Sequence, residues 1–130
     1  MRKTSKKNYK KKLDTIFSQF IRLRDNGKGC YTCGVKKTWK ELQCGHFIPR
    51  QYFALRYDER NCHSQCYACN MLYNGQPSKY ALNLIKEYGE GIIQELENLR
   101  QRITKDFPYE LKIEEYNEKV KNMLPYVAIN

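Results

Sequence analysis

Four cysteines stand in two CxxC pairs, a pattern typical of metal sites. Cys30 and Cys33 form the first pair, and Cys66 and Cys69 form the second. A CxxC turn directs two thiolates at one ion, and two such turns complete the tetrahedral four-sulfur shell of a structural zinc. Gly34 follows the first pair, and a glycine eases the tight turn around a metal. The spacing therefore predicts a structural Zn²⁺ held by these four cysteines.

Other roles of the cysteine-rich segment compete with this prediction. Cys44, Cys62 and His63 are candidates to replace one of the four ligands, although small packing residues are the simpler interpretation of the two cysteines. A redox CxxC of the thioredoxin type is expected within a βαβ unit, and the sequence pattern predicts none. A disulfide framework is disfavoured because the chain reads as cytosolic. Its basic N-terminus lacks the apolar segment of a secretory signal, and no apolar stretch reaches membrane-spanning length.

The residues between the two pairs resemble a nuclease motif. His46 stands in "CGHFIPR", Asn61 ends "RYDERN", and Asn70 directly follows the last cysteine of the second pair. The order Asn61, Cys66, Cys69, Asn70 resembles the pattern N-x4-C-x2-C-[HN] of the HNH or ββα-metal nucleases. A longer string, "LQCGHFIPRQYFALRYDERNCHSQCYACN" continued by "YNGQPSKYALNLIKEYG", resembles the phage NinG (Rap) recombination nucleases. These are related to endonuclease VII-type resolvases, and the resemblance extends over most of the chain.

This resemblance implies a divalent-metal-dependent DNA endonuclease that cuts branched recombination DNA, such as Holliday junctions or D-loops. It implies His46 as the base that deprotonates a water, and Asn70 as a ligand of a catalytic Mg²⁺ or Mn²⁺ ion. Asn61 would fix the loop and orient the histidine. Neutral imidazole accepts a proton near neutral pH, and hard cations prefer oxygen ligands. The resemblance also implies a phage or prophage origin, a place in the host cytoplasm, and a homodimer, since a resolvase cuts two strands.

Gly45 departs from the family pattern, because many related nucleases place an acidic metal ligand directly before the histidine. Asp58, Glu59, phosphate oxygens and water are the alternatives for the missing ligand, and a softer ion bound by His46 is another. The departure keeps a second function open, namely a zinc-ribbon protein that binds nucleic acid without cutting it. The motif residues also have plain structural alternatives: a packed histidine, a helix cap and a turn asparagine.

The charge of the chain favours a polyanionic partner. Lysine and arginine number 24 against 14 aspartates and glutamates, which leaves a formal charge of +10. Neutralising phosphates releases condensed counterions, so such a protein is expected to bind nucleic acid, although a merely basic protein is the plain alternative. Arg50, Arg56 and Arg60 are the candidate phosphate contacts, because arginine makes paired hydrogen bonds to phosphate oxygens.

The elements that position these residues follow from hydrophobic periodicity and turn signals. Apolar residues spaced three and four apart predict a helix over residues 9–26, and a short two-stranded hairpin is expected within 36–50. Residues 51–61 are predicted to form a loop. A short helix that contains the second CxxC pair is expected to follow and to end at about residue 73. Three further helices are expected within 78–88, 91–103 and 108–124. The predicted fold class is α+β: residues 1–8 form a basic arm, 9–75 a zinc-organised HNH-like core, and 76–130 a helical region for dimer or DNA contacts.

Overall fold

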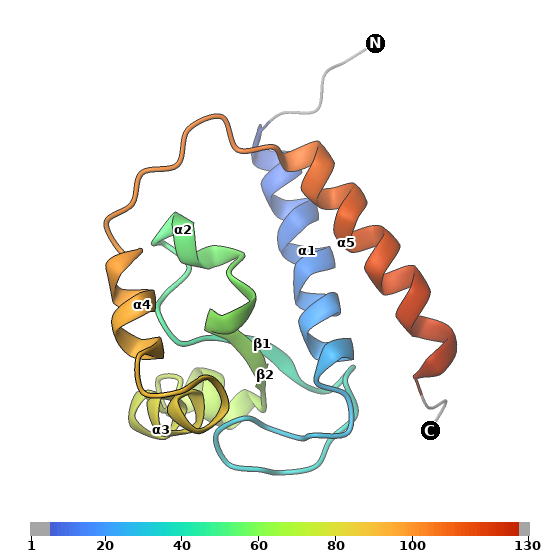
Figure 1. The fold of residues 1–130 in the computed structure, drawn as a ribbon. Helices are drawn as coiled ribbons and strands as arrows, with labels where there is room; N and C mark the ends of the chain where they lie inside the picture. Colours follow the sequence, from blue (N-terminus) through green and yellow to red (C-terminus); the bar gives the residue numbers. More distant parts are fainter. Residues whose placement is uncertain (1–5, 128–130) are drawn as a thin grey trace.

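Residues 6–127 of the chain are described by the computed structural model, which combines helices with one small sheet (Figure 1). Its elements are α1 Lys6–Arg24, β1 Gln43–His46, α2 Phe53–Arg56, η1 Glu59–Asn61, β2 Cys62–Gln65, η2 Ala68–Leu72, α3 Pro77–Tyr88, α4 Ile92–Asn98, α5 Tyr109–Met123 and η3 Leu124–Tyr126. This confirms the expected α+β class. Within the described residues, none of the helices has the length and apolar character needed to cross a membrane.

The sheet consists of two antiparallel strands that are distant in sequence. In β1–β2 pairing Gln43 lies opposite Gln65, and His46 lies opposite Cys62. The expectation of a hairpin within residues 36–50 was therefore wrong. The partner strand is Cys62–Gln65, in a part of the chain for which a short helix rather than a strand was expected. The segment expected to be loop between the strands contains α2 and η1.

Side-chain alternation gives the sheet two faces, each covered by a helix. Cys44, His46 and Cys62 share one face, and Cys44 and Cys62 belong to the core that includes Phe17 of α1. On the opposite face, the hydroxyl of buried Tyr80 from α3 donates to the carbonyl of Gly45, at 2.7 Å. The sheet is therefore the middle layer between α1 and α3.

The end of α1 is fixed to β2 by charged side chains. Arg24 donates to the carbonyls of Glu59 and Cys62, at 2.9 and 2.7 Å, and forms an ion pair with Asp25. Asp25 in turn accepts from the backbone N–H of Ser64 at 3.0 Å. These bonds place the long N-terminal helix against the sheet with a defined register.

The remaining helices lie in two groups. α5 runs beside α1 and buries Tyr116 and Val120 in the same core, whereas α3 and α4 enclose a second core with Leu55 (Figure 1). α1 begins at Lys6, earlier than predicted, so the last residues of the expected basic arm are helical and residues 1–5 lie outside the described part. α4 ends at Asn98, before the end of the helix expected within residues 91–103, and Ile103 is exposed.

Candidate metal centre and surroundings of His46

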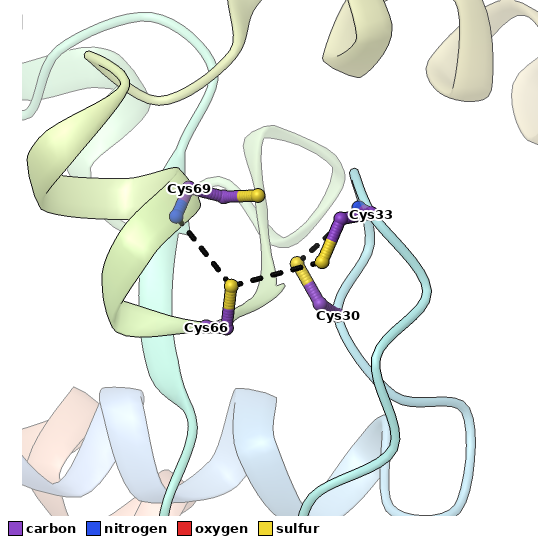
Figure 2. Close-up of side chains that lie close together, drawn as sticks. All are labelled: Cys30, Cys33, Cys66 and Cys69. Atoms are coloured by element: carbon purple, nitrogen blue, oxygen red, sulfur yellow. Dashed lines mark hydrogen bonds between the residues drawn. The ribbon is translucent and has the colours of Figure 1, made fainter.

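The four cysteines of the two CxxC pairs converge on one point (Figure 2). Their sulfur atoms all lie within 4.8 Å of one another, and Sγ of Cys33 is 3.7 Å from Sγ of Cys66. Cys30 and Cys33 come from the loop after α1, and Cys66 and Cys69 follow β2, at the beginning of η2. Such a group could hold a tetrahedral metal ion such as zinc. The geometry agrees with the prediction made from the spacing.

The local backbone of this centre has the features of a metal-binding turn. The N–H of Cys33 points at Sγ of Cys30 at 3.5 Å, and the N–H of Cys69 points at Sγ of Cys66 at 3.4 Å. Burial raises the pKa of the Cys30 thiol, but hydrogen bonds from Thr32 and from the backbone outweigh it and lower the pKa to about 6. Gly34 has φ of +79°, a left-handed conformation that glycine adopts without strain. Burial raises the pKa of Cys33, the other thiol of this turn, so the turn favours the thiolate form at Cys30.

His46 ends β1 and is held by a backbone carbonyl. Its Nε2 lies 2.9 Å from the carbonyl oxygen of Arg56. A carbonyl only accepts hydrogen bonds, so Nε2 carries the proton and Nδ1 of the neutral ring is the basic nitrogen. Burial lowers the pKa of His46, and the nearby cation of Arg50 adds to this, while the bond to Arg56 opposes it. The ring is therefore neutral and oriented at neutral pH.

A small pocket of about 120 Å³ lies beside His46. Asp14 of α1 lines it and accepts from Arg56 at 2.8 Å and from the hydroxyl of Tyr57 at 2.7 Å. Burial raises the pKa of Asp14, but these hydrogen bonds prevail and lower it, so the carboxylate stays ionised. The sequence contained no signal for this pairing, because Asp14 and Arg56 are on separate elements far apart in the chain.

The three candidate phosphate-binding arginines are in different situations. Arg56 is engaged by Asp14, and Arg60 forms ion pairs with Asp58 at 3.1 Å and Glu95 at 2.9 Å. Arg50 is exposed and lines the pocket, and within the described residues its guanidinium has no hydrogen bond or ion pair. Arg50 is thus the arginine of the three that is available to a phosphate without breaking an internal pair.

Asn61 is completely buried and fixes the loop that follows β1. Its Oδ1 accepts from the N–H of Ile48 at 2.8 Å, and its Nδ2 donates to the carbonyls of Ile48 and Leu55, at 2.9 and 3.1 Å. This loop continues to Arg56, whose carbonyl holds His46. The contacts match the loop-fixing position that the resemblance implied for Asn61.

Asn70 lies in η2, directly after a cysteine of the metal centre. Its Nδ2 donates to Oε1 of Gln43 at 2.8 Å, which leaves its own carbonyl oxygen available as a hard ligand. Gln43 belongs to the face of β1 opposite to Cys44 and His46. The structure therefore brings Asn70 to the sheet, but on the side away from the His46 ring.

The space beside Gly45 is filled by Gln65 of the neighbouring strand. A Cβ atom at position 45 would lie 1.8 Å from Oε1 of Gln65. Gln65 is fully buried, and its Nε2 donates to Oγ1 of Thr32 and to the carbonyl of Gly75, both at 3.0 Å. Its Oε1 has no hydrogen-bond partner among the described residues. An amide thus occupies the place where the family pattern leads one to expect a carboxylate.

His63 is a buried packing residue on the α3 face and lies outside both cysteine groups. Its ring stacks on Tyr31, with 3.9 Å between centroids, and its nitrogens lie 3.1 Å from the hydroxyls of Tyr80 and Tyr88. Burial, followed by the charge of Arg24, lowers the pKa of His63 to about 3. The histidine is therefore neutral at neutral pH. Its Nε2 lies 3.5 Å from Oε2 of Glu87, but this contact is not an ion pair because the ring carries no charge.

Cys44 and Cys62 lie next to His46, a grouping that was not predicted. The two sulfur atoms and a ring nitrogen of His46 all lie within 4.8 Å of one another. The order Cys44-x-His46 on a strand would have shown that these two share a face. Cys62 was hidden because its strand was not recognised.

Fold and site define a small α+β protein organised around a four-cysteine centre that could hold a metal. The chain belongs to the NinG family: the family described as Bacteriophage Lambda NinG protein matches residues 1–124. Protein ninG of Salmonella phage P22 is 33% identical over 116 residues, covering 87% of this chain and 56% of the relative. Protein ninG of Escherichia phage lambda is 32% identical over the same coverage, and that of Escherichia phage 933W is 33% identical over 93 residues, covering 71% and 46%.

The chain thus spans about half the length of the curated relatives it matches. No solved structure matches this chain.

Proposed function

We propose that this chain is a divalent-metal-dependent DNA endonuclease of the HNH type that hydrolyses phosphodiester bonds in branched recombination DNA. The observation that carries the proposal is the state of His46. The ring is neutral and oriented by the Arg56 carbonyl, and it lines a pocket next to Arg50, whose guanidinium has no partner among residues 6–127. A base for the attacking water and a cation for the phosphate are two of the parts that phosphodiester hydrolysis needs, and the third is stabilisation of the oxygen that leaves when the P–O bond breaks.

In this mechanism His46 takes a proton from the attacking water through its unprotonated ring nitrogen. The Nε2–H group continues to donate to the Arg56 carbonyl, which keeps the ring in the required tautomer and orientation. Arg50 holds a nonbridging phosphate oxygen, and Asn61 keeps the intervening loop from moving. General base catalysis of this kind contributes about a hundredfold or more to the rate.

The donors in the structure suit two kinds of metal unequally. The four thiols fit a structural zinc, which would join the loop after α1 to η2. For a catalytic Mg²⁺ or Mn²⁺, the Asn70 carbonyl oxygen has suitable chemistry but lies on the face of the sheet away from His46, and buried Gln65 replaces the carboxylate expected at position 45. A cation beside His46 would therefore not be held by Asn70. A bound cation would polarise the phosphate and stabilise the leaving oxygen. Most of its ligands would have to be water and phosphate oxygens.

Branched DNA as the substrate follows from the resemblance to recombination nucleases, and the charge supports a nucleic-acid partner in general. The formal charge of +10 favours a phosphate-rich partner, and contacts to phosphates carry no sequence information. We propose that shape rather than sequence selects the substrate, that two copies act together on a junction, and that the protein works in the cytoplasm of a phage-infected or lysogenic bacterium. The apolar face of α5 packs on α1, so a dimer contact through the C-terminal helices would use their other faces.

The test uses purified protein, a four-way DNA junction and Mn²⁺. Wild-type protein is expected to nick the junction, and His46→Ala to lose about a hundredfold or more of the rate while still binding it. Ser18→Ala, which changes the same pocket without removing a proposed function, serves as the control. Junctions that are bound but never cut by the wild type would instead support the second candidate, a zinc-ribbon protein without catalysis. The observation that favours this candidate is the amide of Gln65 in the carboxylate's place.

A further inference from the structure

A second group of soft metal ligands lies on the α1 face of the sheet, separate from the four-cysteine centre. Cys44 and His46 are two residues apart on β1, and Cys62 lies directly opposite His46 on β2. Strand alternation and register therefore bring all three side chains to one face at neighbouring positions. Their ligand atoms lie within 4.8 Å of one another.

The chemistry of this group selects a thiophilic ion. Two sulfur atoms and an imidazole nitrogen are the donors that zinc accepts in three-ligand protein sites, whereas Mg²⁺ and Mn²⁺ prefer oxygen. Binding would release the two thiol protons to solvent, and two thiolates and a neutral imidazole would balance the charge of a divalent ion. The adjoining pocket of about 120 Å³ borders Cys44 and His46 and has room for a water at a fourth position.

We propose that Cys44, His46 and Cys62 form a second zinc-type site, and that an ion bound there prevents His46 from acting as a base. An ion on the free ring nitrogen removes the lone pair that accepts the proton. An ion on Nε2 instead breaks the bond to the Arg56 carbonyl that orients the ring. Either arrangement prevents His46 from acting as the general base. The proposal has two halves. The binding half, that the site holds an ion, stands by itself, whereas the inhibitory half, that the ion stops catalysis by His46, rests on the proposed endonuclease function.

Counting bound ions tests the binding half without any activity measurement. The reduced 130-residue protein is saturated with zinc or Co²⁺, desalted and assayed for metal. Wild-type protein is expected to hold two ions, one for each cysteine group, and Cys44→Ala and Cys62→Ala to hold one. Ser18→Ala, from the same pocket but without a soft ligand, is expected to keep both. A wild type that holds a single ion, or a Cys44→Ala protein that keeps two, overturns the site.

Absorption spectra of the cobalt-loaded protein distinguish the loss of one metal site from unfolding of the whole protein. Cys44 is only partly buried, so Cys44→Ala is expected to retain the four-sulfur absorption of the first centre and a far-ultraviolet spectrum like that of wild type. The His46→Ala spectrum should lose the contribution of the second ion only. If the second cobalt signal is unchanged by His46→Ala, the histidine is not a ligand and the proposal fails.

A cleavage assay tests the inhibitory half. Loading the second ion into wild-type protein is expected to slow Mn²⁺-dependent junction cleavage about a hundredfold, the loss expected for removing a general base. In Cys44→Ala the ratio of rates with and without added zinc should stay near unity. Equal inhibition of both proteins overturns the switch. If neither protein cuts DNA, the proposed function falls, and the ion count still decides whether the second site exists.

Discussion

At the scale of single residues, the centre of this protein depends on polar side chains with very specific partners. Asn61, Gln65 and His63 are all buried, and each uses its hydrogen bonds to hold a different segment near the sheet. Buried polar groups of this kind cost about 1–3 kcal/mol each when they lose their partners, so they also limit which substitutions the chain tolerates. Two substitutions test this directly.

Gly45→Ala is expected to destabilise the protein by about 1–3 kcal/mol, the usual cost of overpacking a buried site. The new methyl group would overlap Oε1, Cδ and Cγ of Gln65, at 1.8, 2.6 and 2.9 Å, and Gln65 is anchored at Thr32 and Gly75. Urea denaturation measures the change. Gly91→Ala is the control, because a methyl group there would meet no atom within 4 Å.

The double variant Gly45→Ala with Gln65→Ala removes the obstruction and tests the cause. Gly45→Ala should lower the free energy of unfolding less in the Gln65→Ala protein than in the wild-type protein. Equal losses on both backgrounds would show that Gln65 is not what excludes a side chain from position 45.

Asn61→Ala is expected to cost about 3 kcal/mol or more of stability, because it leaves three buried backbone groups of Ile48 and Leu55 without partners. Asn83→Ala is a matched control that removes one amide hydrogen bond, to the carbonyl of Tyr31, from a partly buried site. Its cost should be about 1 kcal/mol. Similar losses for the two variants, measured by thermal or urea unfolding, would contradict the role assigned to Asn61.

At the scale of elements, α3 is joined to the sheet through a continuous set of hydrogen bonds. The hydroxyl of Tyr80 donates to the Gly45 carbonyl at 2.7 Å, so it accepts from Nδ1 of His63. The hydroxyl of Tyr88 is then the donor to Nε2 of the same ring. Protonating His63 would break this order, because both ring nitrogens would become donors.

The pH dependence of stability should reflect this neutral histidine. Its pKa is lowered to about 3 in the folded protein, so below pH 6.5 the unfolded chain binds more protons than the folded one. Stability is therefore full above pH 6.5 and falls as the pH decreases toward 3. Between pH 6.5 and pH 5, His63 should account for a loss of about 2 kcal/mol.

His63→Phe keeps an aromatic ring against Tyr31 but cannot titrate, so its unfolding free energy should vary less over this range. The chain has two histidines, and His46→Gln measures the part that the other one contributes. Ring resonances of His63 that titrate near pH 6.5 in the folded wild type would show that the histidine is not held neutral.

At the scale of the whole molecule, the four-cysteine centre joins two segments that little apolar burial holds together. The loop after α1 carries Cys30 and Cys33, and the segment after β2 carries Cys66 and Cys69. The buried residues of this region form a small cluster of Cys30, Leu42, Cys66 and Cys69, so apolar burial contributes little there. A metal ion would supply most of the stability of this end of the sheet.

Removing the metal should therefore lower the melting temperature substantially, by roughly 10 °C or more, since a domain of this size shifts by about 2–8 °C per kcal/mol. The measurement is thermal unfolding before and after treatment with a strong chelator. Cys30→Ser should show the same decrease without chelator, whereas Cys44→Ala should keep most of the stability. A Cys30→Ser protein as stable as wild type would mean that the centre does not organise the fold.

The sequence by itself determined the features that depend on local spacing. Paired CxxC turns place thiols at one ion whatever lies between them, and three-and-four periodicity predicted α1, α3 and α5 because a helix buries one side of its own segment. The long string that runs through the second CxxC pair likewise indicated the family to which the chain belongs. These inferences needed no knowledge of how distant segments meet.

Only the tertiary structure decided which side chains share a face of the sheet. Strand pairing joins residues 43–46 to 62–65, and a shift of one position would exchange the two faces. That register places Cys62 beside His46 and Gln65 over Gly45, and the docking of α1 adds the pairing of Asp14 with Arg56. Such contacts arise from long-range packing, so local sequence patterns carry no signal for them.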